Sequence, residues 1–319
     1  MQGGFSNDDV VASPMVLICC TRRKIEKMKI YFDKNVLSHL ISAKRGAAET
    51  NGVTKDDVKV LCEAVASGKI TNVLSTMHLQ EAAYALRAAS PRVAAEELSL
   101  IQDLMDTTRI IKPSGDMLID DIISYARGEA LGSPLLPFTY KLEDLFSFGG
   151  DIEERMKALD DTDKQNHQFV ELAEAAKDND RAFVLQEFGG ERPDFEEFFA
   201  QKIYQRIINT IDNVEKRTGS EGLVDACKSK GIEGMVRIPS LFLAEGVGLS
   251  YQYARIFDEI SNKQKRRRGD PSDLKHALSA SACDLLITHD SDFFFWMNRV
   301  PDKPIQLLDH VHKLIEAVG

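Results

Sequence analysis

The sequence contains few cysteines, one tryptophan and no long apolar run. The five cysteines are odd in number, and none stands in the paired spacing of a zinc site or a disulfide framework. No apolar stretch approaches the roughly 18–20 residues that a membrane span needs. The short MVLICC stretch is followed by basic residues, which is the reverse of a secretory signal. These absences argue against a secreted or membrane-spanning protein, and we expect a cytoplasmic one.

A glycine-rich phosphate-binding loop is also missing, which disfavours a nucleotide-driven enzyme. Residues 1–27 are predicted to form a flexible N-terminal extension, because the first strand-like segment begins only after Met28. A translation start at Met28 is therefore a hypothesis, which N-terminal sequencing of the native protein would test.

Negative charge is concentrated in one segment of the chain. The formal charge of −10 by itself argues weakly against a general nucleic-acid binder. Residues 143–198, however, hold 17 acidic and 6 basic residues, a local net of −11, so the remaining chain is close to neutral at +1. One interpretation of this acidic segment is a solvated helical cap. The other is that it screens an active site or recruits a basic protein partner or inhibitor, and so restricts which nucleic acid has access.

The N-terminal part alternates short apolar strands with helices. KIYF (29–32) is predicted to be a buried parallel strand, and Thr54 is predicted to cap a helix with acids in its first turn. The elements expected in this part are strands over 29–32, 70–74 and 109–113, and helices over 35–43, 54–68, from Ser75 or Thr76, and 92–105.

This alternation stops after residue 113 and returns near the C-terminus. Residues 114–260 are predicted to be mainly helical, with one apolar stripe that suits helix packing at Ile203, Ile207, Ile208 and Ile211. The expected elements after them are a helix from Pro271, strands over 284–288 and 305–308, and a closing helix. We therefore predict an α/β fold: a doubly wound parallel sheet in two parts, 28–113 and 261–319, interrupted by a large, mainly helical insertion.

Five acidic side chains lie at or just beyond predicted strand ends or near helix starts. They are Asp33, Glu81, Asp273, Asp290 and Asp292. Side chains from different elements of an α/β sheet converge at such positions. Converging carboxylates repel one another unless a cation holds them, and an all-oxygen cluster suits Mg²⁺ or Mn²⁺. The pattern therefore indicates a metal-dependent enzyme that acts on phosphodiesters.

Four motifs, in this order, resemble those of the PIN domain, a nuclease fold of the PilT N-terminus type. They read FDKNVL from Phe32, STMHLQE from Ser75, DLKHALSA from Asp273 and THDSDFF from Thr288. The resemblance covers roughly 28–113 and 265–312. It implies a parallel sheet with helices on both faces, an acidic pocket at the carboxyl ends of the strands, and cleavage of single-stranded RNA with Mg²⁺ or Mn²⁺.

The resemblance also implies a role for each matched residue. Asp33, Asp273 and Asp290 are expected to be the principal metal ligands. Glu81 and Asp292 are expected to complete a second metal site or to orient the attacking water. The polar residues expected to support the site are Asn35 and Thr288. Two features depart from the family pattern: Lys34 follows the first acid, and an insertion of about 150 residues stands between the second and third motifs.

Several neighbouring residues have more than one interpretation. We expect His276 to be packed or hydrogen-bonded rather than to contact substrate, and His289 to point away from the ligands. A basic run, Lys263, Lys265, Arg266, Arg267 and Arg268, precedes the third motif and is either a solvated loop or a phosphate-binding patch. The aromatic run 293–296 is expected to pack in the core, although one exposed ring could stack on a base.

The sequence thus predicts a metal-dependent endoribonuclease, for which a toxin role is one option. The alternatives are a non-catalytic PIN-like protein that binds RNA or serves as a scaffold, and a nuclease that acts on DNA or structured RNA. A phosphatase of the haloacid-dehalogenase type is disfavoured, because it needs a second Asp two residues after the first, where Asn35 stands.

Overall fold

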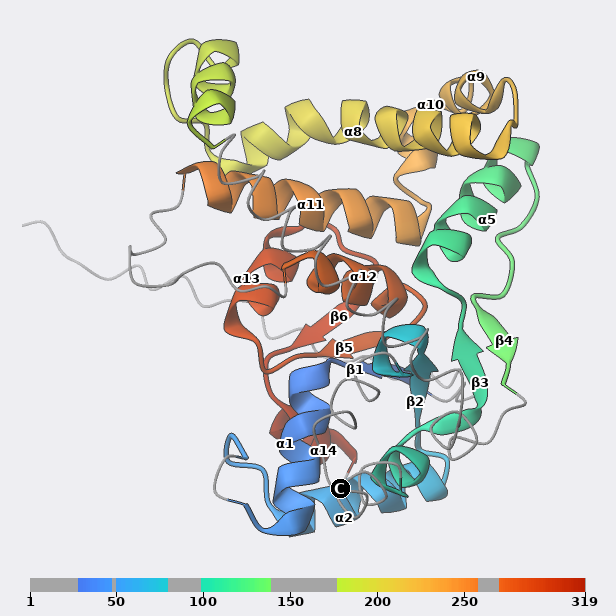
Figure 1. Cartoon of the computed structure of the whole chain (residues 1–319), viewed down its shortest axis with the longest axis vertical. Coiled ribbons are helices and arrows are strands. Elements are labelled where there is room, and N and C mark those ends of the chain that lie inside the picture. Colours follow the sequence, from blue (N-terminus) through green and yellow to red (C-terminus); the bar gives the residue numbers. More distant parts are fainter. Residues whose placement is uncertain (1–27, 48–49, 80–98, 139–176, 258–269, 319) are drawn as a thin grey trace, which may run out of the picture.

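The computed structural model describes residues 28–47, 50–79, 99–138, 177–257 and 270–318, which form an α/β fold around a six-stranded sheet (Figure 1). The strand order is β4-β3-β2-β1-β5-β6. The strands are β1 (Met28–Phe32), β2 (Ile70–Ser75), β3 (Asp106–Ile111), β4 (Leu135–Pro137), β5 (Leu285–Ile287) and β6 (Gln306–Leu308). Every neighbouring pair is parallel except β3 and β4, which run antiparallel. The five predicted strands are thus parallel, as expected, and the unpredicted β4 adds an antiparallel edge, which makes the sheet mixed.

The order of the strands places a topological switch point beside β1. The chain runs outward from β1 through β2 to β3, and it returns much later to place β5 on the other side of β1. The carboxyl ends of β1 and β5 lie level, since Phe32 is in register with Ile287. In open α/β sheets, ligands bind in the crevice beyond the carboxyl ends of the strands at such a point.

One face of the sheet is covered by α1 (Lys34–Arg45), α2 (Lys55–Ala66) and α14 (Val311–Val318). Ile30 and Phe32 point to this face, while Tyr31 between them points to the other, as the two-residue period of a strand requires. Thr54 caps α2 with its hydroxyl and Asp57 bonds back to the Thr54 backbone, so the predicted cap is confirmed as a capping box.

The opposite face carries the larger hydrophobic core, to which the described helices of 114–257 contribute. The helices on this side are α5 (Ser114–Arg127), α8 (Phe195–Thr218), α9 (Leu223–Lys228), α10 (Gly231–Met235), α11 (Pro239–Phe257), α12 (Asp270–Ala280) and α13 (Ser291–Arg299). Residues 177–187 are also helical on this side, where Val184 is buried, whereas the helical residues 99–104 pack on the first face through Leu100 and Leu104. Residues 76–79 are helical as well. The helical segment therefore shares its core with the sheet.

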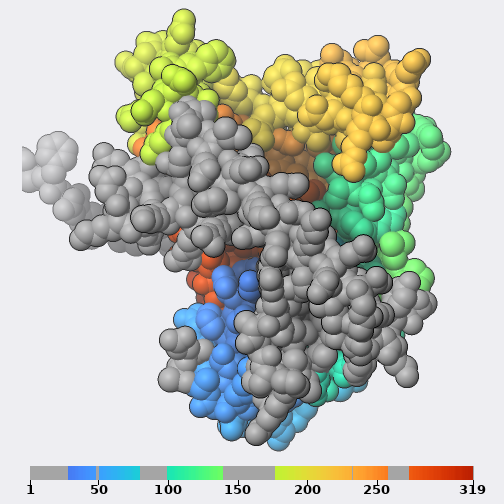
Figure 2. Space-filling model, viewed as in Figure 1, coloured from blue at the N-terminus to red at the C-terminus, as the bar shows by residue number. Residues whose placement is uncertain are grey.

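Helix α11 is the centre of this side of the molecule. It packs against α8 on its outer side and against α12 and α13 on its sheet side (Figure 1). Sixteen of its 19 residues are buried, which explains why its sequence is apolar almost all round. Its one buried carboxylate, Glu245, accepts hydrogen bonds from Arg206 (2.8 Å) and Thr210 (2.6 Å) of α8. The apolar stripe predicted in α8 is buried here, and the outer surface of α8 lies along one end of the molecule (Figure 2).

Two elements were not predicted, and the limits of several predicted elements moved by one to three residues. Strand β4 and helix α13 have no counterpart among the expected elements, and β3 begins at Asp106 rather than at residue 109. Within the described residues, no helix is long and apolar enough to cross a membrane. The predicted N-terminal extension, 1–27, lies outside the described residues, as does most of the acidic segment 143–198.

Candidate active site

Asp33 directly follows β1 and is held from several sides. Its backbone N–H donates to Ile287 O (2.9 Å), which fixes it against the end of β5. Its Oδ1 atom accepts from the Lys34 backbone N–H (2.7 Å) at the start of α1, and its Oδ2 atom accepts from Thr288 Oγ1 (2.8 Å). The residue is only 3% exposed. A buried carboxylate needs such partners, and the N-terminus of α1 also favours its negative charge.

Asp290 lies three residues beyond the end of β5 and is the N-cap of α13, as Asp33 is of α1. Its Oδ1 atom accepts from the backbone N–H groups of Asp292 (2.9 Å) and Phe293 (3.1 Å). Asn35 donates from Nδ2 to its Oδ2 atom (3.3 Å), and Thr288 Oγ1 accepts from the Asp290 backbone N–H (3.0 Å). The hydroxyl of Thr288 thus bridges the two aspartates, and four of the predicted site residues form one connected group at the switch point.

Asp273 is linked to this group through its own helix. It lies one turn before His276 on α12, so both residues share a face of that helix. The Nε2 atom of His276 lies 4.0 Å from Asp33 Oδ1, which directs this face of α12 toward the site. The Asp273 side chain is half-buried, as is that of Asp292 in the first turn of α13.

The remaining predicted site residues cannot be placed. Glu81 and the basic run 263–268 lie outside the described residues. Among the described side chains, no three His, Cys, Asp or Glu residues are grouped closely enough to enclose a metal ion. The donors that do converge are carboxylate, hydroxyl and amide groups, and Mg²⁺ is commonly held by only one or two carboxylates together with water and substrate phosphates. Oxygen donors of this kind are those that Mg²⁺ and Mn²⁺ prefer.

A buried polar network that was not predicted lies behind Asp33. Tyr31 OH is hydrogen-bonded to His276 Nδ1 (2.7 Å) and to Ser75 Oγ (3.1 Å). His78 Nδ1 accepts from the Ser75 backbone N–H (3.1 Å), so its Nε2–H donates to Phe32 O (2.6 Å). His276 is thus buried and hydrogen-bonded, as expected, and the network ties the ends of β1 and β2 to α12.

Four imidazoles form a stack on the other side of the site. His289 stacks on His310 with a centroid separation of 4.5 Å and lies 5.0 Å from His39, while His310 lies 4.5 Å from His312. They come from α1, the loop after β5, the loop after β6, and α14. This cluster was not predicted, and its one local signal in the sequence is the pair of histidines in HVH (310–312). The His289 ring thus lies between those of His39 and His310.

Hydrogen bonds set the protonation of His289. Its Nε2 atom accepts from the Val311 backbone N–H (3.2 Å), so its single proton is on Nδ1, which donates to His39 Nδ1 (2.7 Å). Burial, and then the neighbouring His310 and His39, lower the pKa of His289 to about 4. A protonated His289 would lose the bond from Val311.

We expect His289 to make the fold less stable in mild acid. The pKa of His289 is about 4 in the folded chain and roughly 6.5 in the unfolded chain. At a pH between these two values, His289 is protonated in the unfolded chain and neutral in the folded one. The free energy of unfolding should therefore fall as the pH drops from about 6.5 to 4. Because the ring is only about half-buried, we expect a loss of roughly 1–2 kcal/mol rather than the full shift.

Urea unfolding at pH 7 and pH 4.5 in EDTA measures this effect. His289→Asn keeps an acceptor for the Val311 N–H and removes the titrating ring, so it should lose less stability on acidification than the wild-type chain. Equal losses of stability in the two proteins would show that protonation of His289 does not cause the loss in acid.

Comparison of the chain with models of known protein families found no match. Comparisons with curated proteins and with solved structures likewise found no match.

Proposed function

We propose that this protein is a metal-dependent endoribonuclease with a PIN-like fold, which hydrolyses phosphodiester bonds of single-stranded RNA. One observation carries the proposal: the two strands beside the topological switch point are each followed by an aspartate, Asp33 and Asp290, and Thr288 bridges them. The α/β sheet with parallel central strands and the acids at its carboxyl edge support the resemblance that the motifs suggest.

The proposed chemistry assigns each group a task. A bound Mg²⁺ or Mn²⁺ would supply a water that is nucleophilic near neutral pH and would stabilise charge on the leaving oxygen. Asp33, Asp273 and Asp290 would hold it, with Glu81 and Asp292 completing the acidic set. Thr288 and Asn35 fix the orientations of Asp33 and Asp290 by the hydrogen bonds described above. Ligands held in this way reorganise little when substrate arrives.

The acidic segment 143–198 is proposed to restrict access or to bind a basic protein partner. Its described end is part of the core, because Val184 and Phe198 are buried. Deletion of the whole segment would therefore damage the fold. Replacement of acids within 143–176 by Asn and Gln tests the idea better: nonspecific RNA cleavage should rise, and an unchanged rate would count against screening.

Cleavage of labelled oligonucleotides tests the proposed activity directly. Single-stranded RNA and single-stranded DNA of the same sequence are incubated with the full chain in Mg²⁺, in Mn²⁺ and in EDTA. We expect RNA cleavage with either metal, at least 100-fold slower cleavage in EDTA, and recovery when Mn²⁺ is added in excess. Faster cleavage of DNA would reassign the substrate. A folded protein that binds RNA but never cleaves it would replace the nuclease with an RNA-binding protein.

A further inference from the structure

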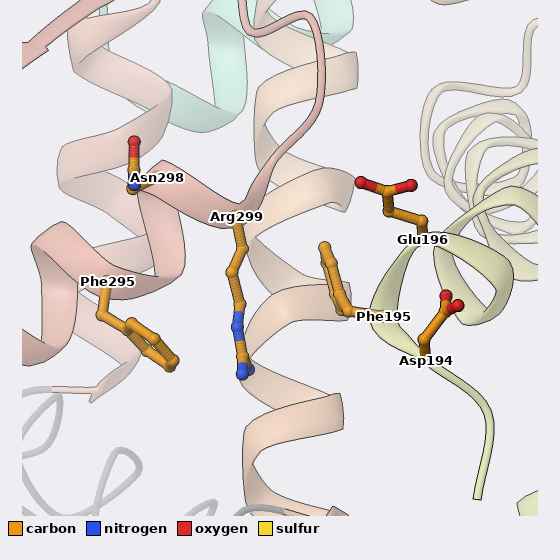
Figure 3. A pocket seen from close by; sticks show the side chains of 6 residues that line it. All are labelled: Asp194, Phe195, Glu196, Phe295, Asn298 and Arg299. Carbon is orange, nitrogen blue, oxygen red and sulfur yellow. The ribbon is translucent and has the colours of Figure 1, made fainter. Parts of the chain in front are cut away.

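A cavity of about 560 Å³ lies between the start of α8 and the end of α13 (Figure 3). Asp194, Phe195 and Glu196 line it from α8, and Phe295, Asn298 and Arg299 line it from α13. Only the α13 side belongs to the helix that Asp290 caps, and none of the six residues is part of the site described above.

An aromatic ring and a guanidinium group form one wall of this cavity. Phe295 is 44% exposed, although Phe293 and Trp296 of the same helix are buried. The Arg299 guanidinium lies 4.1 Å from the centroid of the Phe295 ring, with Phe195 on its other side at 5.5 Å (Figure 3). The flat group thus lies between two rings, and the Phe295 ring stays partly exposed.

The back of the cavity is rigidly supported. Phe195 packs edge-on against Tyr253 of α11, with a centroid separation of 5.4 Å. The Tyr253 hydroxyl donates to Pro193 O (2.8 Å), and Arg192 donates to that hydroxyl (3.2 Å). Because these contacts join α8 to α11, the cavity walls need little ordering when a ligand binds.

The charges of the cavity select against ionic ligands. A cation would have to compete with Arg299, which already covers the aromatic faces. A phosphate placed inside would face the carboxylates of Asp194 and Glu196. A flat, uncharged ligand avoids both conflicts, because it can pack against the wall formed by Phe295 and Arg299 while its N–H groups donate to a carboxylate on the α8 side of the cavity.

We propose that this cavity binds one unpaired base of a single-stranded nucleic acid. The proposal rests on the proposed function for its connection to cleavage: α13 carries Asp290 at its N-cap and Phe295 about 7.5 Å further along the helix axis. The base would pack against the wall formed by Phe295 and Arg299, with its phosphate outside the cavity. Stacking requires a base that is not paired, so the cavity favours a single strand over a duplex.

The carboxylates also predict a base preference. Adenine and cytosine carry an exocyclic amino group that can donate to Glu196, whereas uracil presents carbonyl oxygens in its place. A strand of adenines or cytosines should therefore bind more tightly than a strand of uracils. Glu196→Gln replaces an acceptor by a group that both donates and accepts, so it should reduce this preference.

Binding of fluorescein-labelled 12-mers of rA, rC and rU to the full chain, followed by anisotropy in EDTA, tests the proposal without cleavage. The loss of one stacked base corresponds to roughly 5- to 100-fold weaker binding, which we expect for Phe295→Ala. Phe295→Trp should bind as the wild type does. Phe183→Ala is the matched control, because Phe183 is also exposed (60%) and carries the Lys202 cation over its ring (5.7 Å) but does not line the cavity.

These measurements test base binding in the cavity separately from the proposed nuclease activity. Any one of four results would overturn the cavity proposal. These are unchanged binding by Phe295→Ala, equal binding of all three oligomers, no binding of any oligomer by folded protein, and tighter Phe295-dependent binding of an Arg-rich peptide. If Phe295→Ala binds normally while metal-dependent cleavage persists, the cavity proposal fails and the nuclease stands. If binding depends on Phe295 but no strand is ever cleaved, the base-binding cavity stands and the nuclease fails.

Discussion

Asp33→Asn should leave the chain folded and slow RNA cleavage by about 10³-fold or more. Asparagine caps a helix about as well as aspartate, so the bond from the Lys34 N–H survives. The Thr288 hydroxyl can rotate to accept from the new amide group. What disappears is the negative charge that would hold a divalent cation, and such a cation contributes several kcal/mol to the transition state.

Single-turnover cleavage rates and thermal unfolding, measured on the same preparations, test this prediction. Asp106→Asn is the matched control: Asp106 accepts from a backbone N–H and a hydroxyl of Thr108, but it begins β3 instead of following a strand. The control should cleave at the wild-type rate. A folded Asp33→Asn protein that cleaves within about threefold of wild type would remove Asp33 from the site.

Phe198→Ala should destabilise the whole fold by about 3–5 kcal/mol, which is the usual cost of truncating a fully buried phenylalanine. Phe198 lies in α8, is fully buried and packs on Tyr253 of α11 with a centroid separation of 5.4 Å. Because the helical segment and the sheet share one hydrophobic core, we expect the loss of stability in α8 to lower the stability of the sheet as well.

The single tryptophan measures this transmission. Trp296 lies in α13 against Tyr251 of α11, so its fluorescence reports on the sheet side of the core. In urea, the Trp296 transition of Phe198→Ala should shift together with the loss of helical circular dichroism. An unshifted Trp296 transition would mean that α8 unfolds as an independent unit. Phe183→Ala, which truncates an exposed ring, should change stability by less than about 0.5 kcal/mol.

Features with local signals could be predicted from the sequence. The cap at Thr54 is set by residues three positions apart, and Asp33 stands directly after a buried apolar run. Helix α13 was missed because a continuous apolar run such as FFFW suits a strand and a helix equally. Strand β4 is only three residues long, and it exists because β3 offers it a pairing edge. Such an edge is not visible in the local sequence.

The candidate site could be predicted only in part, for the same reason. Asp33, Thr288 and Asp290 follow strands, so their convergence follows from the parallel arrangement of β1 and β5. The Tyr31–His276 bond and the histidine stack join segments that are distant in the chain. The Phe295 cavity likewise depends on how α8 lies against α13. These features arise from tertiary packing, and no local spacing of residues predicts them.

The hydrogen bond between Asp33 and Thr288 joins residues 255 positions apart, and this separation sets the delay between the synthesis of the two residues. At the 5–20 residues per second of protein synthesis, Thr288 leaves the ribosome roughly 10–50 seconds after Asp33. Throughout that interval β1 lacks its β5 neighbour, and Asp33 lacks both Thr288 and Asp290. A nascent chain, or one that stops early, therefore cannot assemble the site, and any RNA cleavage by this protein begins only when its last strands have folded into place.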